Sequence, residues 1–158
     1  MATSTVDGMV EEAVLKRRRS QGSFYERIKF RLDDGSTMTW AKAHVMNNVG
    51  DLLAPGTRGR FYLYTAIDHR GISGVRAADG RESFGVAKVN ETVGLWIVIV
   101  NVLLTIMYVT LMDKVSVLAL ILIVLGVPMF FLYRQNRLDA EKAFNAEAGF
   151  RPAMLAAA

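Results

Sequence analysis

Two histidines, His44 and His69, are the only imidazole groups in the 158-residue chain and are its candidates for acid–base chemistry. A histidine-based catalytic site needs a carboxylate that orients the imidazole and a nucleophile within reach. Asp68 directly precedes His69, but adjacent strand residues point to opposite faces, so Asp68 is badly placed to orient it. The pair precedes Arg70-Gly71 and is typical of a turn. A membrane-bound enzyme would depend on these residues alone, and the sequence does not favour an enzyme.

Metal and cofactor sites are not predicted either. Two histidines without cysteine or a spaced carboxylate cluster make a poor zinc site, and the chain has no cysteine at all. The two glycines within residues 56–59 lack the Lys and Ser/Thr ending of a phosphate-binding loop. We therefore expect no cofactor and no bound metal.

Two uncharged apolar blocks, residues 94–112 and 115–133, are separated only by Asp113-Lys114. A helix needs about 20 mostly apolar residues to cross a bilayer. A buried helix of a soluble protein is rarely apolar on all faces over this length. The blocks therefore predict a transmembrane helical hairpin over residues 91–133, with helices at about 94–112 and 115–133.

Positively charged residues flank this hairpin unequally, seven near its outer ends against one in the turn. Lys and Arg accumulate on the cytoplasmic side of membrane helices. The first 20 residues contain no apolar run for a secretory signal. We expect a multi-pass protein of a bacterial-type inner (plasma) membrane, with both termini cytoplasmic. The eight cations are Arg76, Arg81, Lys88, Arg134, Arg137, Lys142 and Arg151 at the ends, and Lys114 in the turn.

The residues before the hairpin have the pattern of β-strands. Ile28, Phe30 and Leu32 alternate with cations, the period of a half-buried strand. Further strands are expected at 37–43, 61–67, 72–77 and 82–86. They are separated by Asp-Gly, Pro-Gly and Arg-Gly turns, of which the first two suit a positive φ. Residues 9–19 fit either a strand paired with 24–32 or a short helix, and we favour the strand.

This pattern predicts a small antiparallel β-barrel at residues 9–90, closed or nearly closed, OB-like or SH3-like. Residues 44–53 lack alternation and fit one or two helical turns, which gives the element order of OB-folds. Residues 1–8 are expected to be disordered, and residues 134–158 to form a cytoplasmic helix and tail. On that helix, Leu138 and Phe144 are available to rest on the β-domain or on lipid. The fold class is thus an α+β membrane protein, a β-barrel followed by a two-helix transmembrane hairpin.

The densest charge in the chain is the run Lys16, Arg17, Arg18 and Arg19. Each cation near a cytoplasmic leaflet gains about 1 kcal/mol from anionic lipid. The alternative is a solvated strand end that keeps the domain soluble. We interpret the run as a lipid-facing basic cluster, with that alternative left open.

Nucleic acid is not favoured as a partner, because the net charge is only +4. Aromatic side chains on an OB-type face would stack bases. We expect instead that two of the strand aromatics fill the core and that the tyrosines are half-exposed. The expected core residues are Phe61 and Trp40, and the tyrosines are Tyr25, Tyr62 and Tyr64.

Polar and small residues line one face of each apolar block, which predicts a helix–helix seam. A turn centred between residues 113 and 114 places Asn101 opposite Gly126, and Tyr108 opposite Ala119. The seam either packs the hairpin internally or joins subunits of a homo-oligomer. Its residues are Asn101, Thr105, Tyr108, Ser116, Ala119 and Gly126.

A small barrel tethered to a membrane, without a catalytic constellation, suggests an interaction module or a small subunit of a larger inner-membrane assembly. Its partners would be the lipid bilayer and a protein partner or further copies of itself. The alternative is an oligomeric channel or transporter component, supported only by the polar face around Asn101. The chain does not identify the partner, the oligomeric state or the biological process.

Overall fold

The computed structural model describes residues 2–66 and 69–149 and divides the chain into two units. The first unit comprises the residues up to Val86 together with those from Asp139 onward. The second comprises Ala87–Leu138. Asp68, the carboxylate considered beside His69, lies outside the described residues, as do Arg151 and the rest of the C-terminal tail.

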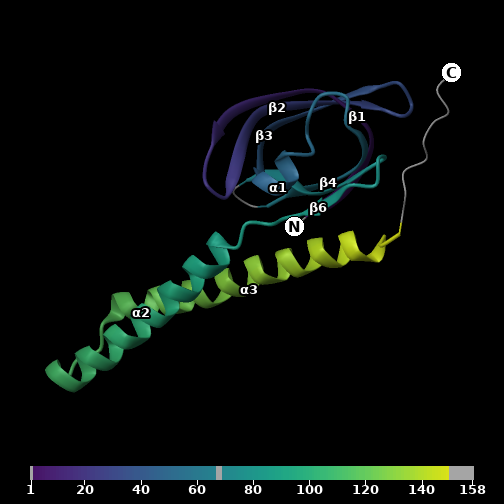
Figure 1. The fold of residues 1–158 in the computed structure, drawn as a ribbon. Helices are drawn as coiled ribbons and strands as arrows, with labels where there is room; N and C mark the ends of the chain where they lie inside the picture. Colours follow the sequence, from purple (N-terminus) through teal and green to yellow (C-terminus); the bar gives the residue numbers. More distant parts are fainter. Residues whose placement is uncertain (1, 67–68, 150–158) are drawn as a thin grey trace. The chain divides into compact units, whose positions relative to one another are not determined.

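Five strands of the first unit close into a β-barrel, as the sequence predicts (Figure 1). Four strand pairs are antiparallel, β1–β2, β2–β3, β1–β4 and β4–β5, and the parallel pair β3–β5 closes the barrel. The strands are β1 (Ala2–Arg18), β2 (Gly22–Leu32), β3 (Thr37–Met46), β4 (Arg58–Thr65) and β5 (Arg70–Ala77). A short strand β6 (Glu82–Phe84) pairs with β5, and helix α1 (Asn47–Gly50) lies between β3 and β4 in the chain. The strand at 9–19 and the helical turn within 44–53 are thereby confirmed.

Strand β1 is longer than expected, and the prediction of a disordered N-terminus is wrong for Ala2 to Gly8. These residues pair with β4, whereas the later residues of β1 pair with β2. Gly8 pairs on both sides, and a Cβ there would lie 2.3 Å from the carbonyl oxygen of Arg31. Glycine is thus required where one strand passes between two partners at a corner of the barrel.

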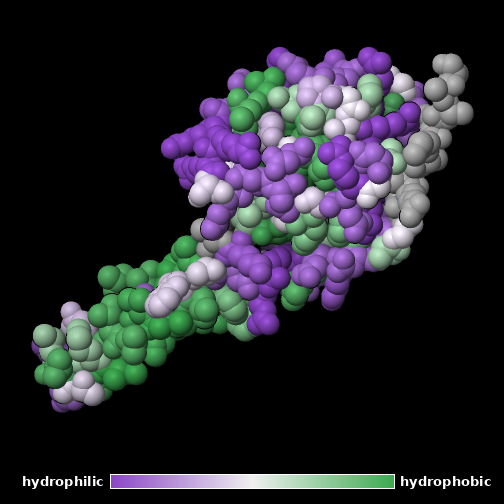
Figure 2. Space-filling view, viewed as in Figure 1, coloured by the Kyte–Doolittle hydropathy of each residue, from purple (hydrophilic) through white to green (hydrophobic). Residues whose placement is uncertain are grey.

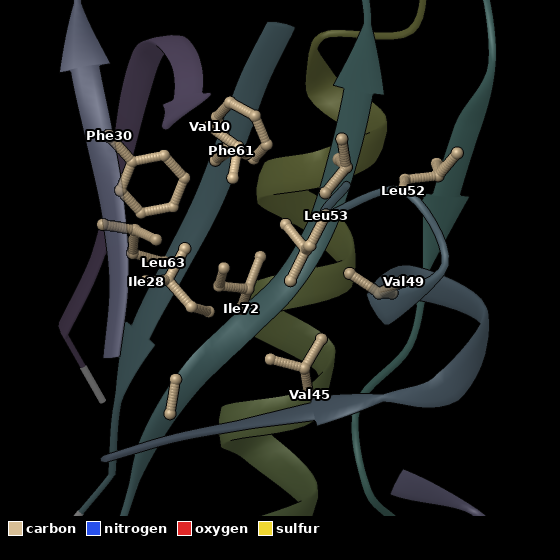
Figure 3. Packing of buried hydrophobic residues seen from close by; sticks show 12 residues of the cluster. Val10, Ile28, Phe30, Val45, Val49, Leu52, Leu53, Phe61, Leu63 and Ile72 are labelled. Atoms are coloured by element: carbon tan, nitrogen blue, oxygen red, sulfur yellow. The ribbon is translucent and has the colours of Figure 1, made fainter. Parts of the chain in front are cut away.

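The barrel interior is filled by apolar side chains from every strand of the wall and from the α1 region (Figure 3). Phe30 and Phe61 pack with their ring centroids 4.8 Å apart, and both are fully buried. On β2 the buried Ile28 and Phe30 alternate with exposed cations, so the predicted period-2 pattern is confirmed. The buried cluster is Val10, Ile28, Phe30, Ala43, Val45, Val49, Leu52, Leu53, Phe61, Leu63, Ile72 and Val75.

Three predicted turns have the backbone conformation that their glycines permit. Gly35, Gly56 and Gly80 have φ of 83°, 89° and 89°. A residue with a side chain adopts such angles at a cost, so these glycines fix where the chain reverses.

The second unit is a pair of long helices that lie side by side (Figure 1). Helix α2 is Val89–Met112, and helix α3 is Val117–Ala146, whose last residues from Asp139 belong to the first unit. The expected second apolar helix and the expected C-terminal helix are therefore one continuous helix.

Both helices are long and apolar enough to cross a membrane. Figure 2 shows a mostly hydrophobic visible surface along the middle of this pair and a mostly hydrophilic one on the barrel. Only 6% and 11% of their most apolar stretches are buried within the chain, whereas the core helix of a soluble protein is mostly buried. The apolar faces of α2 and α3 are thus not explained by packing inside this protein.

Candidate functional site

The basic cluster, Lys16 to Arg19, lies at the end of β1 and in the turn to β2, and all four residues are exposed. The side chain of Asn47 in α1 holds this turn. Its Nδ2 donates to the carbonyl oxygens of Arg19 and Ser20, both at 2.9 Å, and its Oδ1 accepts from the Ser23 hydroxyl at 2.8 Å. Asn47 was not singled out from the sequence, because nothing there links a lone asparagine to a turn 28 residues earlier.

Other cations of the barrel are neutralised by neighbouring acids. Arg27 pairs with Glu12 at 3.0 Å, and Lys29 pairs with Glu11 at 2.9 Å. Within the basic cluster, the part of the chain that the structure describes shows one ion pair, between Arg18 and Asp51 at 3.3 Å. The cluster is therefore the region of the barrel where positive charge is least compensated.

A row of rings begins beside the basic cluster on the outer face of the barrel. Arg17, Phe24 and His44 are successive cross-strand neighbours on β1, β2 and β3. The rings of Phe24 and His44 are 4.7 Å apart, and the Arg19 guanidinium lies 5.5 Å from the Phe24 centroid. Phe24 is 37% exposed, so a hydrophobic ring lies open among cations.

The two histidines meet in this row, which the sequence did not predict. Their rings are 6.0 Å apart, and His69 also contacts the edge of Tyr64 at 5.6 Å. Burial, followed by the charges of His69 and Arg19, lowers the pKa of His44. His44 is thus neutral at pH 7, and its described neighbours are aromatic and cationic. The described contacts of the two imidazoles thus include the rings of Phe24 and Tyr64.

The strand aromatics are less available than expected. Phe61 is in the core and Trp40 packs partly against it, as predicted. The expectation of half-exposed tyrosines is wrong for Tyr62 and Tyr64, which are 4% and 3% exposed. Tyr64 contacts the ring of His69, and Tyr62 contacts the ring of Phe144. These outward-facing tyrosines are therefore not free to stack bases.

The helix seam exists, but its predicted pairing is wrong. A Cβ at Gly126 would lie 2.9 Å from a methyl of Val98, and one at Gly94 would lie 3.3 Å from the backbone of Phe130. In both pairs the residue numbers sum to 224, whereas the prediction of Asn101 opposite Gly126 needs 227.

The physical reason for this shift is the loop. Helix α3 begins at Val117, and on the observed register Val117 is level with Met107 in α2. The residues after Asp113 are not helical, so they run back beside the last turn of α2 before α3 begins. A non-helical residue covers more length than the 1.5 Å rise of a helical one, which shifts every facing pair.

The other predicted seam residues have different positions from those expected. Ser116 precedes α3 and caps it, because its Oγ accepts from the Ala119 N–H at 3.3 Å. Ala119 is buried, whereas Tyr108 is 37% exposed and does not pair with it as predicted. On the observed register Thr105 takes the position opposite Ala119.

Asn101 is buried, but its amide is bonded within its own helix. Its Nδ2 donates to the carbonyl oxygen of Ile97 at 2.7 Å, and the Thr105 hydroxyl donates to the carbonyl oxygen of Asn101 at 2.8 Å. An ion pair between Glu91 of α2 and Arg137 of α3, at 2.8 Å, adds a polar link across the helix pair.

The most extensive contact that sequence reasoning missed is made by the end of α3 within the first unit. We call residues 139–149 the strap. Phe144 is buried on the outer face of β4 and β5, with its ring 5.0 Å from Tyr62 and 5.1 Å from Phe84. The Arg76 guanidinium lies 4.2 Å from the same ring and donates to the Phe144 carbonyl oxygen at 3.1 Å. Phe144 was noted as available for such a contact, but its partners were not predicted.

A carboxylate of the strap is held next to this ring. The Tyr62 hydroxyl donates to Glu147 at 2.5 Å, and Arg60 pairs with Glu147 at 3.1 Å. Burial and the contact with Glu147 raise the pKa of Tyr62 to about 12. The Tyr62 hydroxyl and Arg60 lower the pKa of Glu147. The hydroxyl therefore stays protonated and the carboxylate stays ionised at neutral pH.

Comparison of the chain with protein families, with curated proteins and with solved structures found no match in any of the three.

Proposed function

We propose that this chain is a membrane-anchored interaction module, or a small subunit of a larger inner-membrane assembly. The observation that supports it is the contrast between a barrel with a closed apolar core and a helix pair whose large apolar side chains are exposed. Exposed apolar surface of this extent marks contact with lipid or with another protein. Because both helices also have the length of a bilayer crossing, we assign them to the membrane.

We assign the barrel to the OB-like rather than the SH3-like type. The strands succeed one another around the wall as β1, β2, β3, β5 and β4, with α1 between β3 and β4 in the chain. OB-folds are five-stranded barrels of this kind that present binding surfaces. Fold type alone does not name a ligand, and a partner would be recognised by the exposed surfaces of the barrel.

We further propose that both termini are cytoplasmic and that the Asp113–Ser116 loop faces the other side. The support is the excess of flanking cations over the single Lys114. Because the chain has no cysteine, Ser20→Cys and Lys114→Cys each give one labelling site. An impermeant thiol reagent applied to intact cells should label position 114 and leave position 20 unlabelled. Labelling of position 20 alone would reverse the orientation.

The basic cluster is proposed to contact anionic lipid headgroups. Its four side chains are exposed and little compensated, and the open Phe24 ring provides an apolar contact beside them. An environment-sensitive dye at Gln21→Cys should shift to the blue in nanodiscs containing anionic lipid and stay unchanged in zwitterionic ones. Replacing Arg17 and Arg19 with glutamate should abolish the shift, whereas Arg27→Glu and Lys29→Glu, changed in the same way, should keep it. An equal shift in anionic and zwitterionic nanodiscs would contradict this proposal and favour a solvated strand end that keeps the domain soluble.

The module and the channel hypotheses differ in assembly. Purification in mild detergent, followed by native mass measurement and identification of copurifying proteins, separates them. A stable complex with a different protein supports the module or subunit. A discrete homo-oligomer without another protein supports the channel alternative, although the Asn101 amide that suggested it bonds within its own helix.

A further inference from the structure

The outer face of β4 and β5 holds the strap through two chemically different contacts. One is a seat for an aromatic ring, formed by Tyr62, Phe84 and the guanidinium of Arg76. The other is a carboxylate site, formed by the Tyr62 hydroxyl and Arg60. Phe144 is in the last turn of α3 and Glu147 directly follows the last helical residue, Ala146, so the end of the helix and the turn after it present both groups to this face.

The seat depends on a glycine of the barrel wall. A Cβ at Gly74 would lie 2.7 Å from the Phe144 ring, so any side chain there would collide with it. A glycine inside a strand marks a close approach of another group, and here that group is the ring of the strap.

Besides their contacts with the strap, both arginines are bound by carboxylates of the barrel itself. Asp7 of β1 binds Arg60 through two contacts of 2.6 Å, and Glu82 of β6 pairs with Arg76. The arginine side chains are 18% and 7% exposed. Asp7 and Glu82 belong to the barrel, so these two salt bridges do not depend on the strap. Groups held in advance in this way are typical of a recognition site, because binding then costs little ordering entropy.

The strap does not fill the surface it covers. A pocket of about 180 Å³ remains between it and the wall, where the strap contributes only small side chains. A helix with larger side chains at those two positions would bury more of the wall. The pocket is lined by Thr3, Ser4, Thr5, Tyr62, Ser73, Ala140 and Ala143.

We propose that this face, formed by Arg60, Tyr62, Gly74 and Arg76, is a docking site for a partner helix that carries an aromatic residue followed three positions later by a carboxylate. The strap of the chain itself occupies the site as an intramolecular competitor. The Arg60 guanidinium and the Tyr62 hydroxyl select the carboxylate, whereas the Arg76 guanidinium and the glycine floor select the ring. This inference rests on the proposed function, since it states where the interaction module would bind its protein partner.

The test uses the full chain in detergent micelles. The variant Phe144→Ala/Glu147→Gln should free the site, and the probe is a synthetic peptide with the sequence of residues 139–149. Titration followed by amide NMR should shift the Gly74 and Tyr62 signals of this variant and leave those of the wild-type chain unchanged. A control peptide with alanine in place of the phenylalanine should bind the variant about tenfold more weakly. Absence of shifts in the variant at millimolar peptide, or equal binding of the control peptide, would overturn the proposal.

A second variant guards against loss of folding. Glu147→Lys keeps the phenylalanine but places a cation next to Arg60, so it should weaken the hold on the strap and also open the site to the peptide. If instead the wild-type chain is a dimer that Phe144→Ala dissociates, the site serves a second copy, and the proposed partner is wrong. If a partner protein copurifies equally well with variants that lack Arg60 or Arg76, the interaction module is supported but this docking site is refuted.

Discussion

The barrel and the helix pair differ in where their large apolar side chains lie. The barrel turns its large apolar side chains inward, and Phe30, Phe61 and Leu63 are fully buried. The helix pair turns most of its apolar side chains outward, and Leu103 and Leu125 are 61% and 62% exposed. Among the described side chains, those that the helix pair buries are small or polar, namely Gly94, Asn101, Ala119 and Gly126.

This difference is what the proposed membrane anchor requires, with the barrel in water and the helix pair in lipid. In water, burial of apolar area is the main favourable term, so the barrel needs a filled core. Between helices in lipid that term is absent, because the lipid is as apolar as the side chains, and association depends on close backbone approach at small residues. The same substitution should therefore have different consequences in the two units.

The largest expected effect separates the units directly. Phe61→Ala should destabilise the barrel by about 3–5 kcal/mol, since it leaves a cavity beside Phe30. Leu103→Ala should cost less than about 0.5 kcal/mol, because its side chain faces outward. Urea denaturation of the full chain in mild detergent, followed by Trp40 fluorescence in a Trp96→Phe background, measures the first. Thermal loss of helical circular dichroism measures the second. If Phe61→Ala and Leu103→Ala lower stability by comparable amounts, the proposed difference between the two units is contradicted.

The next effect lies in the helix seam. Gly126→Leu should destabilise the pair by about 1–3 kcal/mol, because its Cβ position is already 2.9 Å from Val98. Asn101→Leu should cost at most about 0.6 kcal/mol, the average for a hydrogen bond between membrane helices, because its amide bonds to Ile97 in its own helix. Thermal denaturation in detergent ranks the two. If Asn101→Leu proves the worse, polar contacts rather than close packing hold the helices.

A smaller effect concerns the strap and depends on pH. The pKa of Glu147 is below its ordinary value of 4.5 while it contacts Tyr62 and Arg60, with Asp7 opposing the shift. A carboxylate with a lowered pKa stabilises its contact fully above about pH 4.5, and the stabilisation is lost as the pH falls through the lowered value. The amide signal of Gly74 should therefore report release of the strap below pH 4.5. Glu147→Gln is the control for other barrel acids, and an identical pH profile for it would contradict this assignment.

The smallest effect belongs to the surface ion pairs. Glu12→Gln breaks the pair with Arg27, and because both side chains are about half exposed, the barrel midpoint in urea should not change measurably. A clear loss of stability would show that the charge pairs on β2 contribute as much as packing does.

The sequence predicts well where one periodic signal dominates. Alternation placed Ile28 and Phe30 in the core, Asp-Gly and Pro-Gly located the turns, and the two apolar blocks located the long helices. The prediction of strands fails where the exposed face of a strand carries polar side chains. Thr3 and Thr5 gave no alternation of apolar residues, so the first half of β1 was expected to be disordered although its backbone pairs with β4.

The contacts that depend on distant parts of the chain were not predictable. The register between the two helices depends on the path of the four-residue loop between Met112 and Val117. The residue types in this loop do not tell whether it crosses directly to α3 or first runs back along α2. The strap contact joins Gly74 and Arg76 to a phenylalanine about 70 residues later, and a lone glycine in a strand does not reveal which ring it accommodates. The convergence of His44 and His69 likewise depends on the parallel pairing of β3 with β5.

The assignment of α2 and α3 to lipid is the central claim, and single cysteines in the otherwise cysteine-free chain test it most directly. Leu103→Cys and Leu125→Cys place a thiol on the exposed face of each helix, and Ser20→Cys places one on the barrel. In lipid nanodiscs, which are open on both sides, a charged maleimide should modify position 20 quickly. It should modify positions 103 and 125 only after the protein is denatured. Reaction at positions 103 and 125 as fast as at position 20 would show that the helices lie in water and would contradict the account.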